Sequence, residues 1–589
     1  MATNAADVIY DCIVLGAGIA GVTAARNLQA KGLSVLLLEG ADRIGGRMYS
    51  KRDFVKNPNY VPNPEEAGQY IPIEAGAEYV HVEKKDRYGA FWDELSRQGF
   101  STSKFHKTGS LIPPDEPRTR TFFPAWKRTL TALETLADPE VYPAAGLLFE
   151  VRRFNPIQQD DIPARAFAQS LDYTGRGRSL AEYTLSAHTP GLLDTPDPLT
   201  PPAEADPTDT ISIAGISSDR IPDQLLEEAD FRLEQESGPA HKICGYDTLP
   251  RQIADEFVAL GGVLEMSDAQ TTQRKVVKVE RTPQGGVQVT TQDGRVFSGR
   301  SAVCTFSVGM LDPDTGEGNT IFGELLTAQK RAALESVKMG PITKFSLEFK
   351  ERVWNGDGPW AGHMAILAHP EGDARTFFSA FPDQQDGPHV LTGLLMSKDH
   401  NRIKDMSDEE ATQHLLDVLH DVFDPEGNRW TPELVLVGGR DATGTFRPNI
   451  LRQDWSQDPF SKGGNSFVTY LPSEQRKLKV IELREALKTP LETLPVFWAG
   501  EATASAYDSD YQPLSVHGAY ISGVRVAEDV EYYLTVANGQ ANQFDRYYRD
   551  KYPPQTHTAS FWDGLLSKVV FGGRPEEEAE EEDARDSSA

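Results

Sequence analysis

Cysteine is scarce in this sequence, which has only three in 589 residues: Cys12, Cys244 and Cys304. Their spacing matches neither a disulfide framework nor a cysteine motif for zinc. The twelve histidines form no H-E-x-x-H motif and no cluster with cysteine. We therefore expect reduced thiols, as in a cytoplasmic protein, and no metal site.

Long apolar runs are also missing. No stretch approaches the ~20 apolar residues of a membrane-spanning helix. The first twelve residues lack the basic and apolar regions of a secretory signal. The last four residues, DSSA, are not a peroxisomal signal of the S-K-L type. These absences predict a cytoplasmic protein that does not enter a membrane.

Basic residues are outnumbered, with 59 Lys and Arg against 88 Asp and Glu, and the net charge is −29. Such a surface repels a phosphate backbone, so we expect no nucleic acid partner. Residues 574–589 hold eight acids and two basic residues, a composition that predicts a disordered tail. The acidity of the remainder favours either solubility alone or the attraction of a cationic substrate.

What the sequence does contain is a dinucleotide-binding βαβ pattern in residues 10–47. An apolar strand runs into Gly16, Gly18 and Gly21, which form G-x-G-x-x-G at the start of a helix. This spacing lets a tight turn bring backbone N–H groups against a pyrophosphate. A second apolar strand ends at Glu39, 23 residues after Gly16, where a carboxylate binds ribose hydroxyls.

The loop that follows reads E-x-x-x-R-x-G-G-R, with Arg43, Gly46 and Arg47 after Glu39. The planar fork of arginine pairs well with phosphate, so we expect this loop to clamp a large dinucleotide. The continuation resembles that of the flavin amine oxidase superfamily. The resemblance implies FAD, rather than NAD, as the cofactor.

Four further segments resemble motifs of the same superfamily, in its order. They are a flavin-facing loop at 74–81, an adenine-side strand at 274–279, a tryptophan loop at 455–464, and a closing A-G-E-A-T and V-H-G-A-x-x-S-G motif within 497–524. The resemblance implies the following cofactor-binding residues: Gly16, Gly18, Ile19, Ala20, Gly21, Glu39, Ala41, Arg43, Gly46, Arg47, Gly76, Ala77, Glu78, Tyr79, Val276, Trp455, Gly500, Glu501 and Val516. For Glu78, a substrate carboxylate and an ordinary loop acid both stay open.

The resemblance implies an α/β fold in which a Rossmann-like FAD-binding domain is interleaved with an α+β substrate-binding domain. We assign 1–105, 240–335 and 451–535 to the first domain, 106–239 and 336–450 to the second, and 536–573 to a C-terminal extension. Helices are expected around 125–136 and 179–186, a mobile proline-rich loop at 194–209, and a hairpin turn at Asp293-Gly294.

Lys344 is the first candidate catalytic residue. It lies in 340–349, which alternates like a half-buried strand. The alternation alone favours an exposed strand lysine. The resemblance instead implies the lysine that holds a water against the flavin and exchanges protons during reoxidation.

His81 is the second candidate, because it resembles a histidine of animal-type spermine and polyamine oxidases. A neutral imidazole there could hydrogen-bond a substrate amine. Asn465 and Ser515 stand where monoamine oxidases carry two flavin-flanking aromatics, which disfavours that activity. The implied substrate pocket comprises Asn465, Tyr507, Asp508, Tyr511 and Ser515, with Asp510 close by. For Tyr507 and Tyr511, a role as cage aromatics and ordinary packing both stay open.

These features predict an FAD-dependent polyamine oxidase-like enzyme, with a small-molecule amine and O2 as its partners. Two other functions stay open. One is oxidation of an L-amino acid or a bulky secondary-metabolite amine, although no arginine for a substrate carboxylate is evident beyond Arg43 and Arg47. The other is a non-catalytic FAD-binding interaction protein. Histone demethylation is disfavoured, because no helical targeting domain or coiled-coil insertion is visible.

Overall fold

The computed structural model describes most of the chain. The described residues are 8–56, 70–78, 80, 89–100, 120–123, 128–131, 137, 139, 150–151, 153–156, 159–171, 211–219, 234–237, 240–354, 363–366, 376–380, 388–396, 398–491, 493–504 and 513–552. The chain divides into two compact units, Met1–Ala541 and Asn542–Ala589. The second unit contains most of α19 (Ala541–Lys551).

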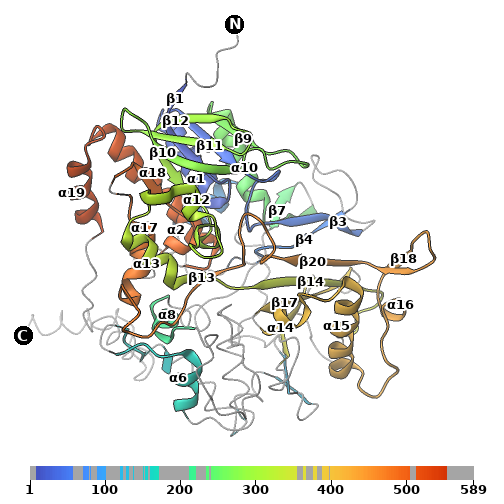
Figure 1. Cartoon of the computed structure of the whole chain (residues 1–589). Coiled ribbons are helices and arrows are strands. Elements are labelled where there is room, and N and C mark those ends of the chain that lie inside the picture. The colour runs from blue at the N-terminus through green and yellow to red at the C-terminus, as the bar shows by residue number, and fades with distance from the viewer. Residues whose placement is uncertain are drawn as a thin grey trace, which may run out of the picture. The chain divides into compact units, whose positions relative to one another are not determined.

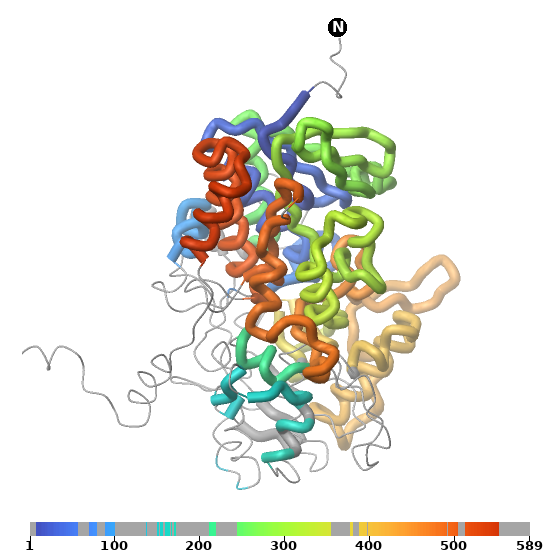
Figure 2. The backbone as a smooth tube through the Cα atoms, turned by 60° about the vertical axis from the view of Figure 1, so that its left-hand side comes forward, coloured from blue at the N-terminus to red at the C-terminus, as the bar shows by residue number. Residues whose placement is uncertain are grey.

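A seven-stranded sheet forms the nucleotide-binding part of the first unit. Its strands are β1 (Ile9–Leu15), β2 (Val35–Glu39), β9 (Val263–Met266), β10 (Val276–Arg281), β11 (Val287–Thr291), β12 (Val296–Cys304) and β22 (Val496–Trp498). The order is β10-β11-β12-β1-β2-β9, and β22 pairs with β12. β1 pairs in parallel with both β2 and β12, so segments almost 290 residues apart lie side by side, as Figures 1 and 2 show.

Local sequence explains these elements. β1 ends in four fully buried residues, as expected for a parallel strand that is covered on both faces. Helix α1 (Ile19–Ala30) packs against α10 (Thr248–Ala259) and α18 (Val516–Thr535). A Cβ at Gly523 of α18 would lie 2.4 Å from the Ala20 carbonyl oxygen, so these two helices cross with their backbones in contact. The hairpin turn at Asp293-Gly294 is confirmed, with Gly294 at φ +80°.

A second seven-stranded sheet has the order β20-β14-β17-β16-β15-β5-β6. Its strands are β5 (Arg120–Phe123), β6 (Arg128–Thr131), β14 (Ile342–Phe349), β15 (His363–Ile366), β16 (Thr376–Ser379), β17 (His389–Met396) and β20 (Ile450–Asp454). The helix expected around 125–136 is therefore wrong in the described residues 128–131. The stretch Arg-Thr-Leu-Thr is half threonine, which favours a strand, and β6 pairs with β5.

Strand β14 is buried along all eight residues, rather than half-buried as its alternation predicted. Phe345, Leu347 and Phe349 pack in a core with helix α15 (Asp408–Phe423). The opposite face of the sheet is covered by the hairpin of β3 (Ser50–Lys56) and β4 (Tyr70–Glu74), which packs against Val390 and Leu451. Because side chains alternate along a strand, Lys344 projects toward that hairpin.

The hairpin of β18 (Gly438–Arg440) and β19 (Phe446–Pro448) projects from the neighbourhood of β20 in both views (Figures 1 and 2). None of the helices in the described part of the chain has the length and hydropathy required to cross a membrane.

Candidate active site

The nucleotide loop has the geometry that the glycine pattern predicted. Gly16 adopts φ +98°, and a Cβ there would lie 2.7 Å from the Thr305 hydroxyl oxygen. A Cβ at Gly21 would lie 1.9 Å from the Gly16 carbonyl oxygen, so only glycine lets α1 start here. A Cβ at Gly18 would meet no protein atom within 4 Å. The first turn of α1, which includes Ile19 and Ala20, has no side-chain cap, and its N–H groups suit a phosphate.

Glu39 joins this loop to the next one. Its carboxylate accepts hydrogen bonds from the backbone N–H groups of Ala17, at 2.6 Å, and Ala41, at 2.7 Å. Burial raises the pKa of Glu39, although both bonds and Arg43 favour the charged form. Each oxygen of a carboxylate has a second lone pair, so these contacts leave capacity for the ribose hydroxyls that the sequence assigned to Glu39.

Three of the sequence motifs meet around Gly40. A Cβ there would lie 2.5 Å from the Phe460 ring and 3.3 Å from the Lys275 Cα. Val276 begins β10, and the register with β11 shifts directly after it. The second glycine loop also packs closely, because Gly45 and Gly18 form a β-bridge and a Cβ at Gly46 would lie 3.3 Å from the Gly18 Cα.

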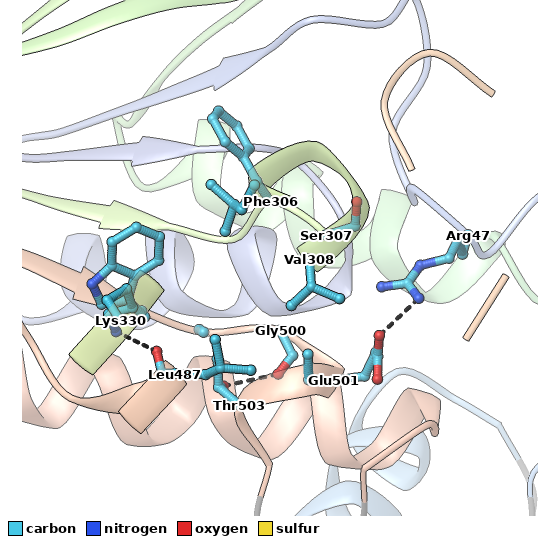
Figure 3. Close-up of a pocket in the computed structure, with 13 residues that line it drawn as sticks. Arg47, Phe306, Ser307, Val308, Lys330, Leu487, Gly500, Glu501 and Thr503 are labelled. Atoms are coloured by element: carbon cyan, nitrogen blue, oxygen red, sulfur yellow. Dashed lines mark hydrogen bonds and ion pairs between the residues drawn. The ribbon is translucent and has the colours of Figure 1, made fainter. Parts of the chain in front are cut away.

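The two arginines of the second loop have protein partners. Arg43 stacks over the Tyr49 ring at 4.1 Å and donates to the Gly46 carbonyl at 2.5 Å. Arg47 donates to Glu501 at 2.9 Å (Figure 3). It also donates to the Gly464 carbonyl at 2.6 Å. Sequence reasoning assigned both arginines to phosphate. In the structure, Arg47 neutralises a carboxylate of the closing motif.

Glu501 is the buried centre of that closing motif. It also accepts hydrogen bonds from the Ser466 hydroxyl at 2.6 Å and the Leu514 N–H at 3.2 Å. Burial opposes its charge, but Arg47 and Arg484 hold the pKa of Glu501 below its usual value. Gly500, at φ +121°, makes the turn out of β22.

A small cavity of about 20 Å³ lies beside this motif, with Val308, Lys330, Trp498 and Gly500 among its lining residues (Figure 3). It has room for about one water, and its lining includes Arg47, Gly500 and Glu501 of the predicted cofactor-binding motifs. Lys330 is buried here, and its side-chain nitrogen donates to the Leu487 and Thr489 carbonyls. These bonds cap the end of α17 (Leu483–Lys488) and give Lys330 a structural role.

Helix α18 begins at Val516, as the motif predicted. The Ser515 hydroxyl accepts the Gly518 N–H at 3.0 Å and so caps the helix, a role that the sequence interpretation as a pocket residue had not included. Asn465 is half-buried next to β21 (Ser466–Val468), and its carbonyl accepts the Gly340 N–H.

The flavin-facing loop is fixed by hydrogen bonds from three directions. Its Ala75 and Gly76 N–H groups donate to the Tyr49 carbonyl, and the Ala77 N–H donates to the Arg47 carbonyl. The Trp455 indole donates to the Ala75 carbonyl at 2.9 Å. A Cβ at Gly76 would lie 1.9 Å from the Arg47 carbonyl oxygen, so glycine is required here.

Lys344 reaches this loop from the second sheet. Its ammonium donates to the Glu78 carboxylate at 2.7 Å and to the Glu74 carbonyl at 3.2 Å, and lies 5.4 Å from the Phe378 ring centre. The side chains of Lys344 and Glu78 are only 7% and 4% exposed. The interpretation as an exposed strand lysine is therefore wrong. Glu78 is the partner of that lysine.

Glu74 lies behind the pair. Its carboxylate accepts the Ser50 hydroxyl at 2.7 Å and the Tyr246 N–H at 2.9 Å. Burial and the nearby Asp247 raise the pKa of Glu74 to about 7, and Lys344 opposes the shift. The site therefore holds a carboxyl group that titrates near neutrality.

This shift predicts a pH-dependent stability. The pKa is about 7 in the folded chain against 4.5 unfolded, so between those values the folded state binds more protons and stability falls as pH rises. Glu74→Gln should remove that loss, which amounts to about 3 kcal/mol. Denaturant unfolding of both proteins at pH 5 and pH 8 measures it. A free-energy difference that stays constant with pH would contradict the assignment.

Several sequence candidates lie outside the described residues. They are Tyr79, His81, Tyr507, Asp508, Asp510 and Tyr511, the expected helix at 179–186, the proline-rich loop 194–209 and the acidic tail 574–589. Their roles stay predictions. Among the residues that the structure describes, no group of His, Cys, Asp or Glu side chains could hold a metal ion.

The structure adds an ion pair that the sequence analysis missed. Arg484 of α17 binds both oxygens of Asp219 at 2.6 Å and also donates to the Ser466 hydroxyl at 3.0 Å. Ser466 in turn donates to Glu501, so a buried polar chain reaches the cofactor motif. Arg484 and Asp219 are 265 residues apart, and no local pattern in the sequence pairs them.

Comparisons with known proteins identify the family. A family model for flavin containing amine oxidoreductases matches residues 222–531, and one for NAD(P)-binding Rossmann-like domains matches 14–95. Polyamine oxidase 1 of Zea mays is 24% identical over 549 residues, which cover 88% of this chain and 89% of that protein. Lysine-specific histone demethylase 1 homolog 3 of Oryza sativa subsp. japonica is also 24% identical, over 88% of this chain but 53% of the relative.

Among solved structures, wild-type putrescine oxidase bound to putrescine matches with a TM-score of 0.60 and 15% identity. The match covers 89% of this chain and 99% of that one, and it supports the α/β fold. The amine oxidoreductase model spans more than half of the 589 residues. The glycine loops, Glu39 and the start of α18 have the form that a flavin dinucleotide requires. The protein therefore belongs to the flavin-containing amine oxidoreductase family, with FAD as its cofactor.

Proposed function

We propose that the protein oxidises a polyamine-type amine at a C–N bond. When bound, FAD supplies the ring that accepts a hydride and the route by which O2 becomes H2O2. Water then hydrolyses the imine product to an aldehyde and an amine. The observation that carries the proposal is the buried Lys344 amine, held against the flavin-facing loop by Glu78 and the Glu74 carbonyl.

The residues of the chain position the cofactor and the substrate and exclude water, whereas the cofactor supplies the redox chemistry. The first turn of α1 would bind the pyrophosphate, and Glu39 would orient the ribose. Gly76, which packs on the Arg47 carbonyl, and Trp455, which donates to the Ala75 carbonyl, fix the loop that would face the flavin ring. Lys344 would supply a fixed positive group beside that ring, and His81 would hydrogen-bond the reacting nitrogen.

The substrate class is inferred from two features. First, Asn465 and Ser515 replace the two aromatics that monoamine oxidases place beside the flavin. Second, the net charge of −29 is compatible with a cationic substrate, as it is with solubility alone. The similarity to polyamine oxidase 1 of Zea mays supports the same substrate class. The demethylase relative supports a second candidate, a methylated lysine in a peptide, since its methylated side-chain nitrogen is also a cationic amine.

Peroxide release from the purified holoenzyme tests the proposal. The substrates are spermine, spermidine, their acetylated forms, benzylamine, an L-amino acid and a methyl-lysine peptide. We expect kcat/KM for one polyamine to exceed that for benzylamine at least tenfold, about 1.4 kcal/mol, and to fall with added salt because distal charges are screened. A preference for benzylamine or the amino acid would contradict the polyamine proposal. A preference for the peptide would favour the second candidate.

A further inference from the structure

The Lys344–Glu78 pair joins the middle of β14 to the end of the loop that follows β4. Lys344 lies mid-strand, paired through its backbone with Leu394 of β17 and Gln453 of β20. Glu78 follows a loop whose N–H groups are bound by the Tyr49 and Arg47 carbonyls. The backbone on each side of the 2.7 Å contact is therefore held by hydrogen bonds, and the contact depends on how β14 and this loop pack together.

Burial makes this contact a strong one. The two side chains are 7% and 4% exposed, and an ion pair removed from water is stable only when each charge keeps its partner. The Glu74 carbonyl is a second acceptor for the ammonium, and the Phe378 ring face lies 5.4 Å away. All three neighbours favour a positive charge on Lys344.

We propose that Glu78 is a positioning residue that fixes both the orientation and the charge of Lys344. This inference rests on the proposed function. Reoxidation transfers two electrons to O2, and two protons complete H2O2: one from the reduced cofactor and one from solvent. Lys344 then acts as a permanent cation that stabilises negative charge developing on oxygen. It does not itself give up or take up a proton.

The charges that face Lys344 among the described residues are those of Glu78 and Glu74, with Asp247 acting on Glu74. Glu348 offers a matched control. It is a buried acid on the same strand and the same side, but its partner is the Asn449 amide rather than a lysine. Its replacement removes a buried carboxylate without changing the Lys344 pair.

The test uses chemically reduced enzyme, so that no amine substrate is needed. FAD is reduced with dithionite without oxygen, mixed with O2, and followed by flavin absorbance. We expect Glu78→Gln and Lys344→Met each to slow reoxidation at least tenfold. The double variant should be no slower than Lys344→Met, because the two residues act as one unit. Glu78→Asp should recover most of the rate, and Glu348→Gln should leave it unchanged.

A second readout needs no cofactor. In the apoprotein, Glu78→Gln should lower the melting temperature, and adding Lys344→Met should restore most of that loss. Reoxidation at the wild-type rate in an FAD-loaded Glu78→Gln variant would overturn the inference, even if its melting temperature falls. A wild-type protein without FAD, or one that oxidises no amine, would instead count against the proposed function.

Discussion

Replacing Gly18 with valine is expected to abolish FAD binding while the apoprotein stays folded. A Cβ at Gly18 would meet no protein atom within 4 Å, so the chain itself has room for the side chain. The space lies at the N-terminus of α1, where the pyrophosphate must approach the backbone. We expect the Kd for FAD to rise at least 100-fold, about 2.7 kcal/mol.

Gly439→Val is the matched control. Gly439 also has open space around its Cβ position, and it lies on the exposed hairpin of β18 and β19 rather than in the nucleotide loop. Fluorescence titration of FAD into both apoproteins gives the two constants, and circular dichroism reports folding. A folded Gly18→Val protein with wild-type affinity would contradict the placement of the pyrophosphate. An equal loss of FAD affinity in both variants would mean that the effect of Gly18→Val is not specific to the nucleotide loop.

The nucleotide-binding part was predictable because its signals are local. Strand β1, the three glycines, α1 and Glu39 lie within 31 consecutive residues, 9–39. Their geometry is dictated by backbone sterics: Gly16 needs φ +98°, and Gly21 has no room for a side chain. The start of α18 at Val516 and the turn at Gly294 were predictable for the same reason.

The environment of Lys344 was not predictable, because it depends on contacts between distant segments. The alternation of residues 340–349 is typical of a strand with one solvent-exposed face, but β3 and β4 cover that face. Glu78 lies 266 residues from Lys344 in the chain, and nothing beside either residue signals the pair. The helix expected around 125–136 failed because pairing with β5 decided the structure of 128–131.

The buried series of polar contacts that ends at Glu501 was not predictable for the same reason. Asp219 follows the short helix α8 (Ile213–Ser218), Arg484 lies in α17, and Ser466 begins β21. The distant contact is that of Asp219, which lies 265 residues from Arg484, whereas Ser466 and Arg484 are 18 residues apart. The charges balance once Arg47 is counted, because Arg484 pairs with Asp219 and Arg47 pairs with Glu501. Both arginines lower the pKa of Glu501. We infer that these polar contacts hold Glu501 in the charged form that Arg47 binds.

Arg484→Met should therefore be among the most destabilising single substitutions in the described core. The side chains of Arg484 and Asp219 are 5% and 6% exposed, and their two bonds are 2.6 Å long. Removing one partner of a buried pair costs about 3–5 kcal/mol, because the other charge is left without compensation. Burial already raises the pKa of Asp219, and Arg484 opposes that shift.

The sign of the pH effect follows. Without Arg484, Asp219 should take up a proton in the folded state at a higher pH, so the damage should be smaller in acid and grow as pH rises. Denaturant unfolding at pH 5 and pH 8 measures this, with Arg484→Met/Asp219→Leu as the control that removes both charges. We expect the double variant to recover most of the lost stability. A loss as large in the double variant would assign the effect to packing of the arginine stem rather than to the ion pair.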